Sequence, residues 1–486
     1  MELFEKIVDL LWGPPLLILM TVTGLYFTVR SGFFQFAKFG HVMKKTFGSM
    51  LIKEDKNKDV DTSEGLLSSF EAISVAIGGS VGVANIGGVS TAIAVGGPGA
   101  VFWMWMSALM GMVLKMVEAT LAVYYRSRDE KGIPFGGPTY YMEKGLGEER
   151  GFKAWGVLAF IFGAGIFSTF FLTLQNYTVS EAVGNTFGIN LIVISVIYVI
   201  SVYLIIGGGI PSLGRAAAKI VPLMCLFYVI GGLIIILKNI TELPLAFKLI
   251  FEGAFTGTAA VGGFAGVGTT QALRLGMARA VYSNEAGWGT SPMIHATARV
   301  KHPVEQGLWG VFEVFVDTII VCSITALVVI MTGQWSSGLD GATLALSAFE
   351  LGLGKIGRVI IAVSIFLLGL STTTGWYAYY EVLLRHLFGD KSKIKDKILN
   401  IYRWAYPIPG MLLVILAVMG ELPGATVWLI ADFSSAVPTF VNVFAILVLS
   451  PVFFKLVKDY KSRYLGIGKV EPDFAVFYED KAKEIK

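Results

Sequence analysis

Long apolar stretches, separated by short polar connections, run through almost the whole chain. About 20 apolar residues in a helix are needed to cross the hydrocarbon core of a bilayer. The pattern therefore predicts an all-α polytopic membrane protein with eleven transmembrane helices. These helices are expected at residues 11–29, 66–95, 98–125, 155–175, 189–206, 216–237, 250–277, 308–331, 359–380, 405–419 and 427–454.

Lysine and arginine side chains are unevenly distributed among the polar connections. They are concentrated at residues 30–65, 126–154, 207–219, 278–307 and 381–404, and they are absent from 96–97, 176–188 and 420–426. Short cytoplasmic loops are rich in Lys and Arg. The distribution thus predicts that the N-terminus lies outside and the C-terminus in the cytoplasm, with the protein in the plasma (cell inner) membrane.

Residues 76–92 interrupt the second predicted helix, because five glycines, a serine and an asparagine fall together in its middle. Hydrocarbon offers no hydrogen-bond partner to the backbone. Non-helical backbone is therefore tolerated at that depth only where it lines a cavity or meets a ligand. We expect this helix to be broken at a binding site.

A second glycine-rich stretch, residues 255–268, lies in the predicted helix 250–277. When the first helix is set aside, each of the two interrupted helices begins a group of five. After five crossings the chain lies on the opposite side of the membrane, so the second group is inverted relative to the first. The expected division is an extra N-terminal helix and its cytoplasmic connection (1–65), a first repeat (66–240), an inverted second repeat (241–456) and a cytoplasmic tail (457–486). Matching broken helices indicate a midplane site in a secondary transporter. Close glycine packing without a ligand is the alternative.

A broken helix offers free N–H groups at the start of one half and free C=O groups at the end of the other. The N–H groups suit a carboxylate, whereas the C=O groups suit an ammonium or a small hard cation. A zwitterionic amino acid together with Na⁺ matches both. Hydroxyl groups at residues 371–374 could complete a Na⁺ shell or bond back to the preceding helical turn. Gln175 either lines the site or makes a helix-end hydrogen bond.

Composition supports this picture, because only 15% of the residues are charged, against about 25% in soluble domains. The net charge of +4 arises in the connections and indicates membrane orientation rather than a nucleic-acid partner. Hydrolase, Walker and dinucleotide motifs are absent from the sequence. We expect no enzyme and no organic cofactor, and an ion gradient as the energy source. Lys115 and Glu118, spaced i, i+3, predict a structural ion pair.

Several long motifs resemble the alanine or glycine:cation symporter family over nearly the whole chain. They are GGPTYYMEKGLG at 136–147, SNEAG at 283–287, EVFVDTIIVC at 313–322 and GWY at 375–377. The resemblance implies the fold of the bacterial leucine transporter, a five-plus-five inverted repeat with one extra N-terminal helix here. It also implies Na⁺ as the co-transported ion. The implied partners are a small neutral amino acid, alanine or glycine, as substrate and the lipid bilayer around the protein.

The resemblance assigns roles by position. Val83 and Ala84 N–H groups would bind the substrate carboxylate, and the Ser80 carbonyl its amine. The implied substrate residues are Gly79, Ser80, Gly82, Val83, Ala84, Asn85, Gln175, Gly263, Phe264, Thr372 and Trp376. The implied Na⁺ ligands are Gly78, Val81, Asn85, Leu368, Ser371 and Thr372. Val83 stands where the family usually has threonine, so one hydroxyl that could contact a cation is lost.

The leading hypothesis is therefore Na⁺-coupled import of alanine or glycine by alternating access. A second hypothesis is proton coupling, with Lys219 acting as a tethered ammonium in place of Na⁺. A third is a channel or a non-transporting amino-acid sensor.

Overall fold

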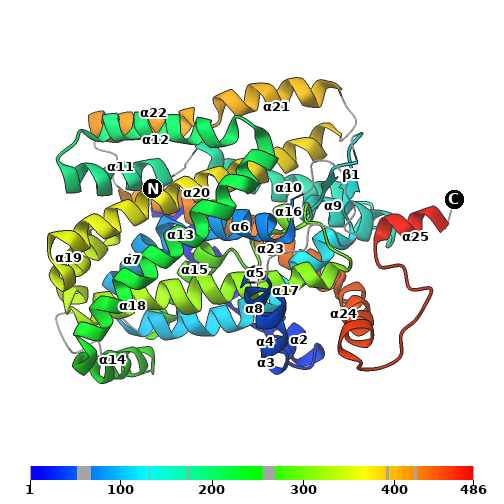
Figure 1. The fold of residues 1–486 in the computed structure, drawn as a ribbon, viewed down its shortest axis with the longest axis horizontal. Coiled ribbons are helices and arrows are strands. Elements are labelled where there is room, and N and C mark those ends of the chain that lie inside the picture. The colour runs from blue at the N-terminus through cyan, green and yellow to red at the C-terminus, as the bar shows by residue number, and fades with distance from the viewer. Residues whose placement is uncertain are drawn as a thin grey trace.

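The glycine-interrupted helix lies in the middle of the helical bundle, as Figure 1 shows for α6 and α7. In the computed structural model, α6 (Ser69–Ser80) begins with a capping box, in which the Ser68 hydroxyl accepts from the Glu71 N–H and the Glu71 carboxylate accepts from the Ser68 N–H. Every residue from Ala72 to Ser80 is buried. A helix that is apolar on all sides is stable only when other helices surround it, and α6 contacts α13, α16, α17 and α20.

The structure describes residues 2–51, 67–130, 132–171, 174–255, 269–389, 393–420 and 424–484. The elements of the first half are α1 Glu2–Leu11, α2 Pro14–Arg30, α3 Phe34–Ala37, α4 Phe39–Lys45, α5 Phe47–Leu51, α6 Ser69–Ser80, η1 Ala84–Gly88, α7 Val89–Gly96, α8 Gly99–Tyr124, β1 Ser127–Arg128, β2 Pro134–Phe135, α9 Pro138–Tyr141, η2 Met142–Glu148, α10 Trp155–Ser168, η3 Thr169–Phe171, α11 Leu174–Phe187, α12 Leu191–Ile206, α13 Gly209–Lys238 and η4 Ile240–Glu242. The strands β1 and β2 form an antiparallel hairpin.

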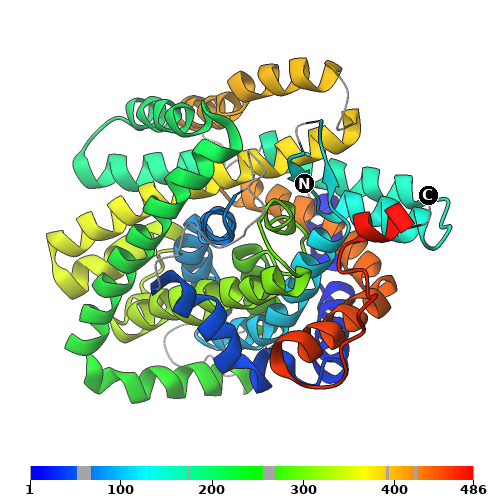
Figure 2. The same ribbon diagram turned by 45° about the vertical axis from the view of Figure 1, so that its right-hand side comes forward.

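The elements of the second half are all helices among its described residues. Its elements are α14 Leu243–Phe255, α15 Thr269–Asn284, α16 Pro292–His295, α17 Pro303–Val314, η5 Phe315–Cys322, α18 Ser323–Met331, η6 Gln334–Ser336, α19 Gly341–Leu353, α20 Lys355–Phe388, α21 Lys393–Ala405, α22 Ile408–Gly420, α23 Gly424–Val448, α24 Ser450–Leu465 and α25 Tyr478–Glu484. The long helices α13 and α20 cross the bundle obliquely, and α12, α21 and α22 cover one edge (Figures 1 and 2).

Many helices are apolar, but few are both long and continuous. Among the described residues, five helices are long and apolar enough to cross a membrane, or up to seven if two bent pairs each count as one span. This bears out a helical multi-pass membrane protein. The number of eleven spans and the five-plus-five correspondence stay predictions.

The predicted helix 155–175 is not continuous. It ends at Ser168, a short 3-10 turn follows, and a separate helix, α11, begins at Leu174. The Ser168 and Thr169 hydroxyls donate to the carbonyls of Gly165 and Ile166 at 2.6 Å each, and such side-chain bonds compete with helix continuation. Gln175 consequently lies at the start of α11 rather than at the end of the preceding helix.

Candidate substrate and ion site

The predicted break in the second transmembrane helix is present. α6 ends at Ser80, η1 begins at Ala84, and the two helical parts are bent by 46°. Between them Val81 has extended backbone, with φ −71° and ψ 94°. The Asn85 Oδ1 atom accepts from the Gly82 N–H at 2.8 Å, which satisfies one backbone group that the break leaves free.

The glycines of the break also let α6 approach α20 closely. A Cβ on Gly375 would lie 2.8 Å from the Gly79 Cα atom, and a Cβ on Gly82 would collide with the Thr372 hydroxyl. Small residues permit such backbone contact between membrane helices. The glycines therefore have both of the roles that the sequence left open. They interrupt the helix, and they allow it to pack closely against α20.

A small cavity of about 20 Å³ lies at the break, roughly the space that one water requires. It is lined by Gly79, Ser80, Gly82, Val83, Ala84, Gln175, Tyr282, Glu285, Trp288, Thr372 and Trp376. Eight of these residues belong to the substrate set implied by the sequence. Asn85 does not line the cavity, and Gly263 and Phe264 lie outside the described residues. Sequence reasoning missed Tyr282, Glu285 and Trp288.

A second interrupted helix faces the first across this cavity. Residues 285–291 separate α15 from α16, and Glu285, Gly287 and Gly289 have left-handed backbone, with φ of 55°, 85° and 85°. Contacts join α7 to α15 and α6 to α16, so the two interrupted helices run in opposite directions. The predicted second break, around residues 255–268, falls almost wholly outside the described residues. The SNEAG motif and the two following glycines are the signal that could have located this one.

Glu285 places a buried carboxylate in the cavity wall. Glu285 is only 2% exposed. One carboxylate oxygen accepts from the Trp376 Nε1–H at 3.0 Å, and the other from the Thr290 hydroxyl at 2.5 Å. Among the described residues, no basic side chain forms an ion pair with it. A buried carboxylate without a counter-charge is costly, so this site favours either a proton or a ligand that carries positive charge.

Aromatic rings limit the room beside Glu285. The Trp376 ring lies 5.2 Å from that of Trp288, 5.6 Å from Tyr379 and 5.7 Å from Tyr380, measured between centroids. Large rings in contact on several sides leave little freedom to a side chain. This wall suits a ligand with a small apolar group.

Three of the four consecutive hydroxyls on α20 already have partners. The Ser371 hydroxyl donates to the Leu368 carbonyl at 2.9 Å, and the Thr374 hydroxyl to the Leu370 carbonyl at 3.0 Å. The Thr373 hydroxyl bonds with that of Tyr198 at 2.7 Å. Back-bonding, the structural alternative for this run, thus holds for two of them.

The Thr372 hydroxyl is different, because it is buried without a hydrogen-bond partner in the described part of the chain. It lies against Gly82 in the break, and a Cβ on Gly78 would lie 3.2 Å from the Ser371 Cβ atom. The structure therefore brings the α6 and α20 members of the implied Na⁺ set side by side. A hard cation takes such oxygen ligands, and the unpartnered hydroxyl fits one.

These features agree with the sequence comparison. The chain matches the sodium:alanine symporter family over residues 1–471. The chain belongs to this family. A sodium/alanine symporter, AgcS, from Methanococcus maripaludis is 36% identical over 457 residues, covering 93% of this chain and 95% of that protein. An uncharacterized transporter from Haemophilus influenzae is 39% identical over 477 residues, covering 97% of this chain and 98% of that protein.

A solved structure supports the fold. The crystal structure of MhsT in complex with L-phenylalanine aligns with a TM-score of 0.57 at 14% identity, covering 84% of this chain and 97% of that one. The likeness shows a shared helical architecture of the leucine-transporter type. As a member of the sodium:alanine symporter family, the chain is an amino acid symporter.

In this family member Asn85 joins the break to a neighbouring helix instead of facing the cavity. Its Nδ2 atom donates to Asp317 Oδ1 at 2.6 Å, and Asp317 Oδ2 accepts from the hydroxyls of Ser283 and Thr318 at 2.7 Å each. The Asn85 amide oxygen accepts from the Gly82 N–H, so both ends of this side chain bond to the protein. The start of η1 and the end of α15, which flank the two breaks, are thereby both tied to η5.

The predicted Lys115–Glu118 pair is replaced by pairs between helices. Lys115 Nζ lies 3.5 Å from the carboxylate of Glu313 and donates to the Ser291 hydroxyl at 2.8 Å. Glu118 instead accepts from the Asn442 amide at 2.5 Å and from the Gly287 N–H at 3.2 Å. Because α8 is buried on all sides here, its polar side chains find partners on the surrounding elements and not along their own helix.

Proposed function

We propose that this family member imports one small neutral amino acid, alanine or glycine, together with Na⁺ by alternating access. The observation that carries the proposal is the cavity at the break of α6, which combines backbone groups of a helix start with one buried, unpaired carboxylate. Positive and negative binding groups within one small cavity match a zwitterion. The family relative named as a sodium/alanine symporter supports the same substrate.

The substrate carboxylate is assigned to the start of η1, at Val83 and Ala84. Backbone N–H groups at a helix start carry partial positive charge and bind anions. The ammonium is assigned to the opposite wall, to the Ser80 carbonyl and the Glu285 carboxylate. Glu285 is then neutralised by substrate, which explains why no basic side chain among the described residues forms an ion pair with it.

The aromatic rings around the cavity support a small side chain. A cavity that holds about one water must open to admit an amino acid, and the aromatic rings that border it favour a side chain as small as hydrogen or methyl. A leucine side chain would need Trp376 or Trp288 to move, and both indoles pack against other rings.

The ion is assigned to the junction of α6 and α20. Carbonyls of Gly78, Val81 and Leu368, with the hydroxyls of Ser371 and Thr372, would surround it. Binding there joins the two helices, so Na⁺ and substrate each raise the affinity of the site for the other.

Proton coupling is the second candidate, because a buried carboxylate such as Glu285 can carry a proton. Lys219 does not suit the role of a tethered ammonium, since its side chain is exposed on α13. The proposal also includes the orientation predicted from the charged connections, in which the C-terminus lies in the cytoplasm.

Uptake of labelled alanine into proteoliposomes tests the proposal. We expect uptake to fall to background when Na⁺ is replaced by choline, and excess glycine, but not leucine, to compete. Uptake that persists in choline and follows an inward proton gradient would favour proton coupling instead.

The Glu285→Gln variant tests the ammonium assignment, because glutamine keeps the shape but loses the charge. Its oxygen can still accept from the Trp376 Nε1–H, and its NH₂ group can donate to the Thr290 hydroxyl, which reverses that bond. We expect at least a tenfold loss of alanine affinity, since a charged hydrogen bond is worth about 1.5–3 kcal/mol. Glu242→Gln, at an exposed position, is the matched control and should behave as the parent. Unchanged alanine affinity in Glu285→Gln would contradict the assignment.

A further inference from the structure

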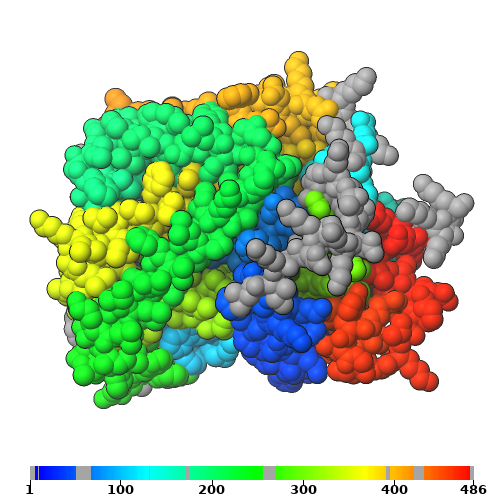
Figure 3. All heavy atoms as spheres, in the orientation of Figure 1, coloured from blue at the N-terminus to red at the C-terminus, as the bar shows by residue number. Residues whose placement is uncertain are grey.

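The C-terminal residues fold back over the end of the bundle and are fastened there. After α24 the chain runs through residues 466–477 into α25, at one corner of the molecule in Figure 3. Arg128 donates to both Glu479 carboxylate oxygens, through Nε at 3.0 Å and Nη2 at 3.2 Å. Lys481 pairs with Glu149 at 2.6 Å. We call residues 466–484 the C-terminal strap.

Aromatic contacts reinforce these ion pairs. The Tyr478 ring lies 5.3 Å from that of Tyr125, and its hydroxyl donates to Glu148 at 2.6 Å. The Arg126 guanidinium lies 4.7 Å from the Phe477 ring centroid. Aromatic and cation–π contacts add to the ion pairs, so the strap is held firmly against the bundle.

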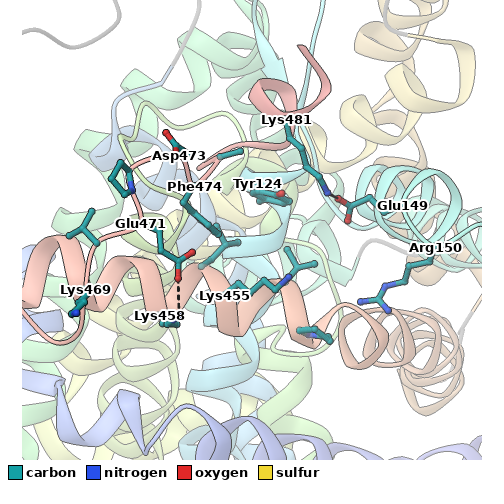
Figure 4. A pocket seen from close by; sticks show the side chains of 16 residues that line it. Tyr124, Glu149, Arg150, Lys455, Lys458, Lys469, Glu471, Asp473, Phe474 and Lys481 are labelled. Carbon is teal, nitrogen blue, oxygen red and sulfur yellow. Dashed lines mark hydrogen bonds and ion pairs between the residues drawn. The ribbon is translucent and has the colours of Figure 1, made fainter. Parts of the chain in front are cut away.

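A cavity of about 1130 Å³ lies between the strap, α24 and the end of α8 (Figure 4). Its lining includes the aromatic side chains Tyr124 and Phe474 and the basic side chains Arg150, Lys455, Lys458, Lys469 and Lys481. It is far larger than the cavity at the helix break and separate from it, since the two share no lining residue.

Two of the lysines in this cavity already have acidic partners. Lys481 pairs with Glu149, and Lys458 with Glu471 at 2.9 Å. In the part of the chain that the structure describes, no ion pair is formed by Arg150, Lys455 or Lys469. One lining acid, Asp473, remains against these three cations. The lining is therefore net positive after its internal pairs are formed.

Two of the unpaired cations face each other. Figure 4 shows Lys455 extending from α24 and Arg150 extending from the opposite wall, each pointing toward the space between them. Like charges that face each other repel. An anion between them removes that repulsion and gains charge-assisted hydrogen bonds, with the planar guanidinium suited to two oxygens of a phosphate.

We infer that the cavity beneath the C-terminal strap binds a phosphate-bearing anion. Arg150 and Lys455 hold the phosphate, Lys469 adds charge at the rim, and Tyr124 and Phe474 offer apolar surface to the organic part. The phosphate can belong to the headgroup of an acidic phospholipid, which gathers at the cytoplasmic leaflet, or to a soluble compound. This inference is independent of the proposed transport function.

Thermal unfolding of the purified full-length protein tests the inference with two probes. One probe is phosphatidylglycerol, compared with phosphatidylcholine, and the other is inorganic pyrophosphate, compared with sodium chloride of equal ionic strength. We expect at least one probe to raise the unfolding temperature. A response to phosphatidylglycerol alone identifies a lipid headgroup, and a response to pyrophosphate identifies a soluble phosphate.

In titrations, the Arg150→Gln, Lys455→Gln double variant should bind the active probe about tenfold more weakly than the parent. The affinity of each single variant should lie between those of the parent and the double variant. Lys248→Gln with Lys355→Gln, two exposed lysines outside the cavity, is the control of equal charge and should bind as the parent. Equal weakening in both double variants would reduce the effect to general surface charge and overturn the inference. Absence of any response in the parent would also overturn it.

Discussion

Neighbouring hydroxyls on α20 differ in the one property that matters for ion binding, which is whether each already has a partner. Thr374 bonds back to the Leu370 carbonyl, whereas the buried Thr372 hydroxyl has no partner in the described residues. A buried polar group without a partner costs about 1–3 kcal/mol. A bound cation would supply that partner at Thr372 and would change nothing at Thr374.

We therefore predict that Thr372→Val lowers the apparent Na⁺ affinity of alanine uptake roughly tenfold, which corresponds to about 1.4 kcal/mol. Thr374→Val, the matched control one half-turn along the same helix, should leave the Na⁺ dependence close to that of the parent. Uptake rates measured as a function of Na⁺ concentration separate the two variants. Equal Na⁺ dependence in both would contradict the assignment of Thr372 to the ion.

Between elements, α6 and α20 approach each other closely, and glycine meets glycine there. A Cβ on Gly375 would lie 2.8 Å from the Gly79 Cα and 3.0 Å from its nitrogen. These are backbone atoms and cannot rotate away. We predict that Gly375→Ala lowers thermal stability by the equivalent of about 1–3 kcal/mol and abolishes alanine uptake.

The control for this prediction is Gly163→Ala on α10, where nothing lies within 4 Å of the added Cβ. It should be neutral or slightly stabilising, because alanine favours the helix. Thermal unfolding and uptake of the two variants give the comparison. A Gly375→Ala protein that transports normally would show that α6 and α20 need not touch at this level.

At the scale of the whole molecule, α24 is tied to the bundle through His302, at the start of α17. The His302 Nε2 atom lies 3.3 Å from Asp459, which also pairs with Arg463 at 2.6 Å. Burial lowers the pKa of His302 from 6.5 to about 4, although Asp459 opposes this shift. Between these values the unfolded chain binds a proton that the folded protein does not.

Stability should consequently fall as the pH decreases from 6.5 toward 4, by up to about 1.4 kcal/mol per pH unit from this group. Thermal unfolding measured from pH 7 to pH 5 checks the prediction. In His302→Gln the pH dependence should be shallower, because glutamine does not titrate. An unchanged slope in that variant would assign the effect to other groups.

Much of the site was visible in the sequence because the membrane makes irregular backbone expensive. The glycines, Ser80 and Asn85 in an otherwise apolar stretch indicated a break at residues 76–92, and the break is there. Gln175 and Trp376 were implied by family resemblance, and both line the cavity. The predicted end of helix 155–175 was wrong, because a hydropathy pattern does not show which hydroxyls bond to the preceding helical turn.

The sequence by itself determined that the chain crosses a membrane with helices and that one of them is interrupted, because both follow from the cost of burying charge and unpaired backbone in hydrocarbon. Only the tertiary structure decided which groups meet at the interruption. Glu285 reaches Trp376, 91 positions away, because left-handed turns after α15 redirect the chain. Asn85 turns to Asp317 rather than to the cavity, since buried polar groups bond to whatever partner the packing of distant helices brings near.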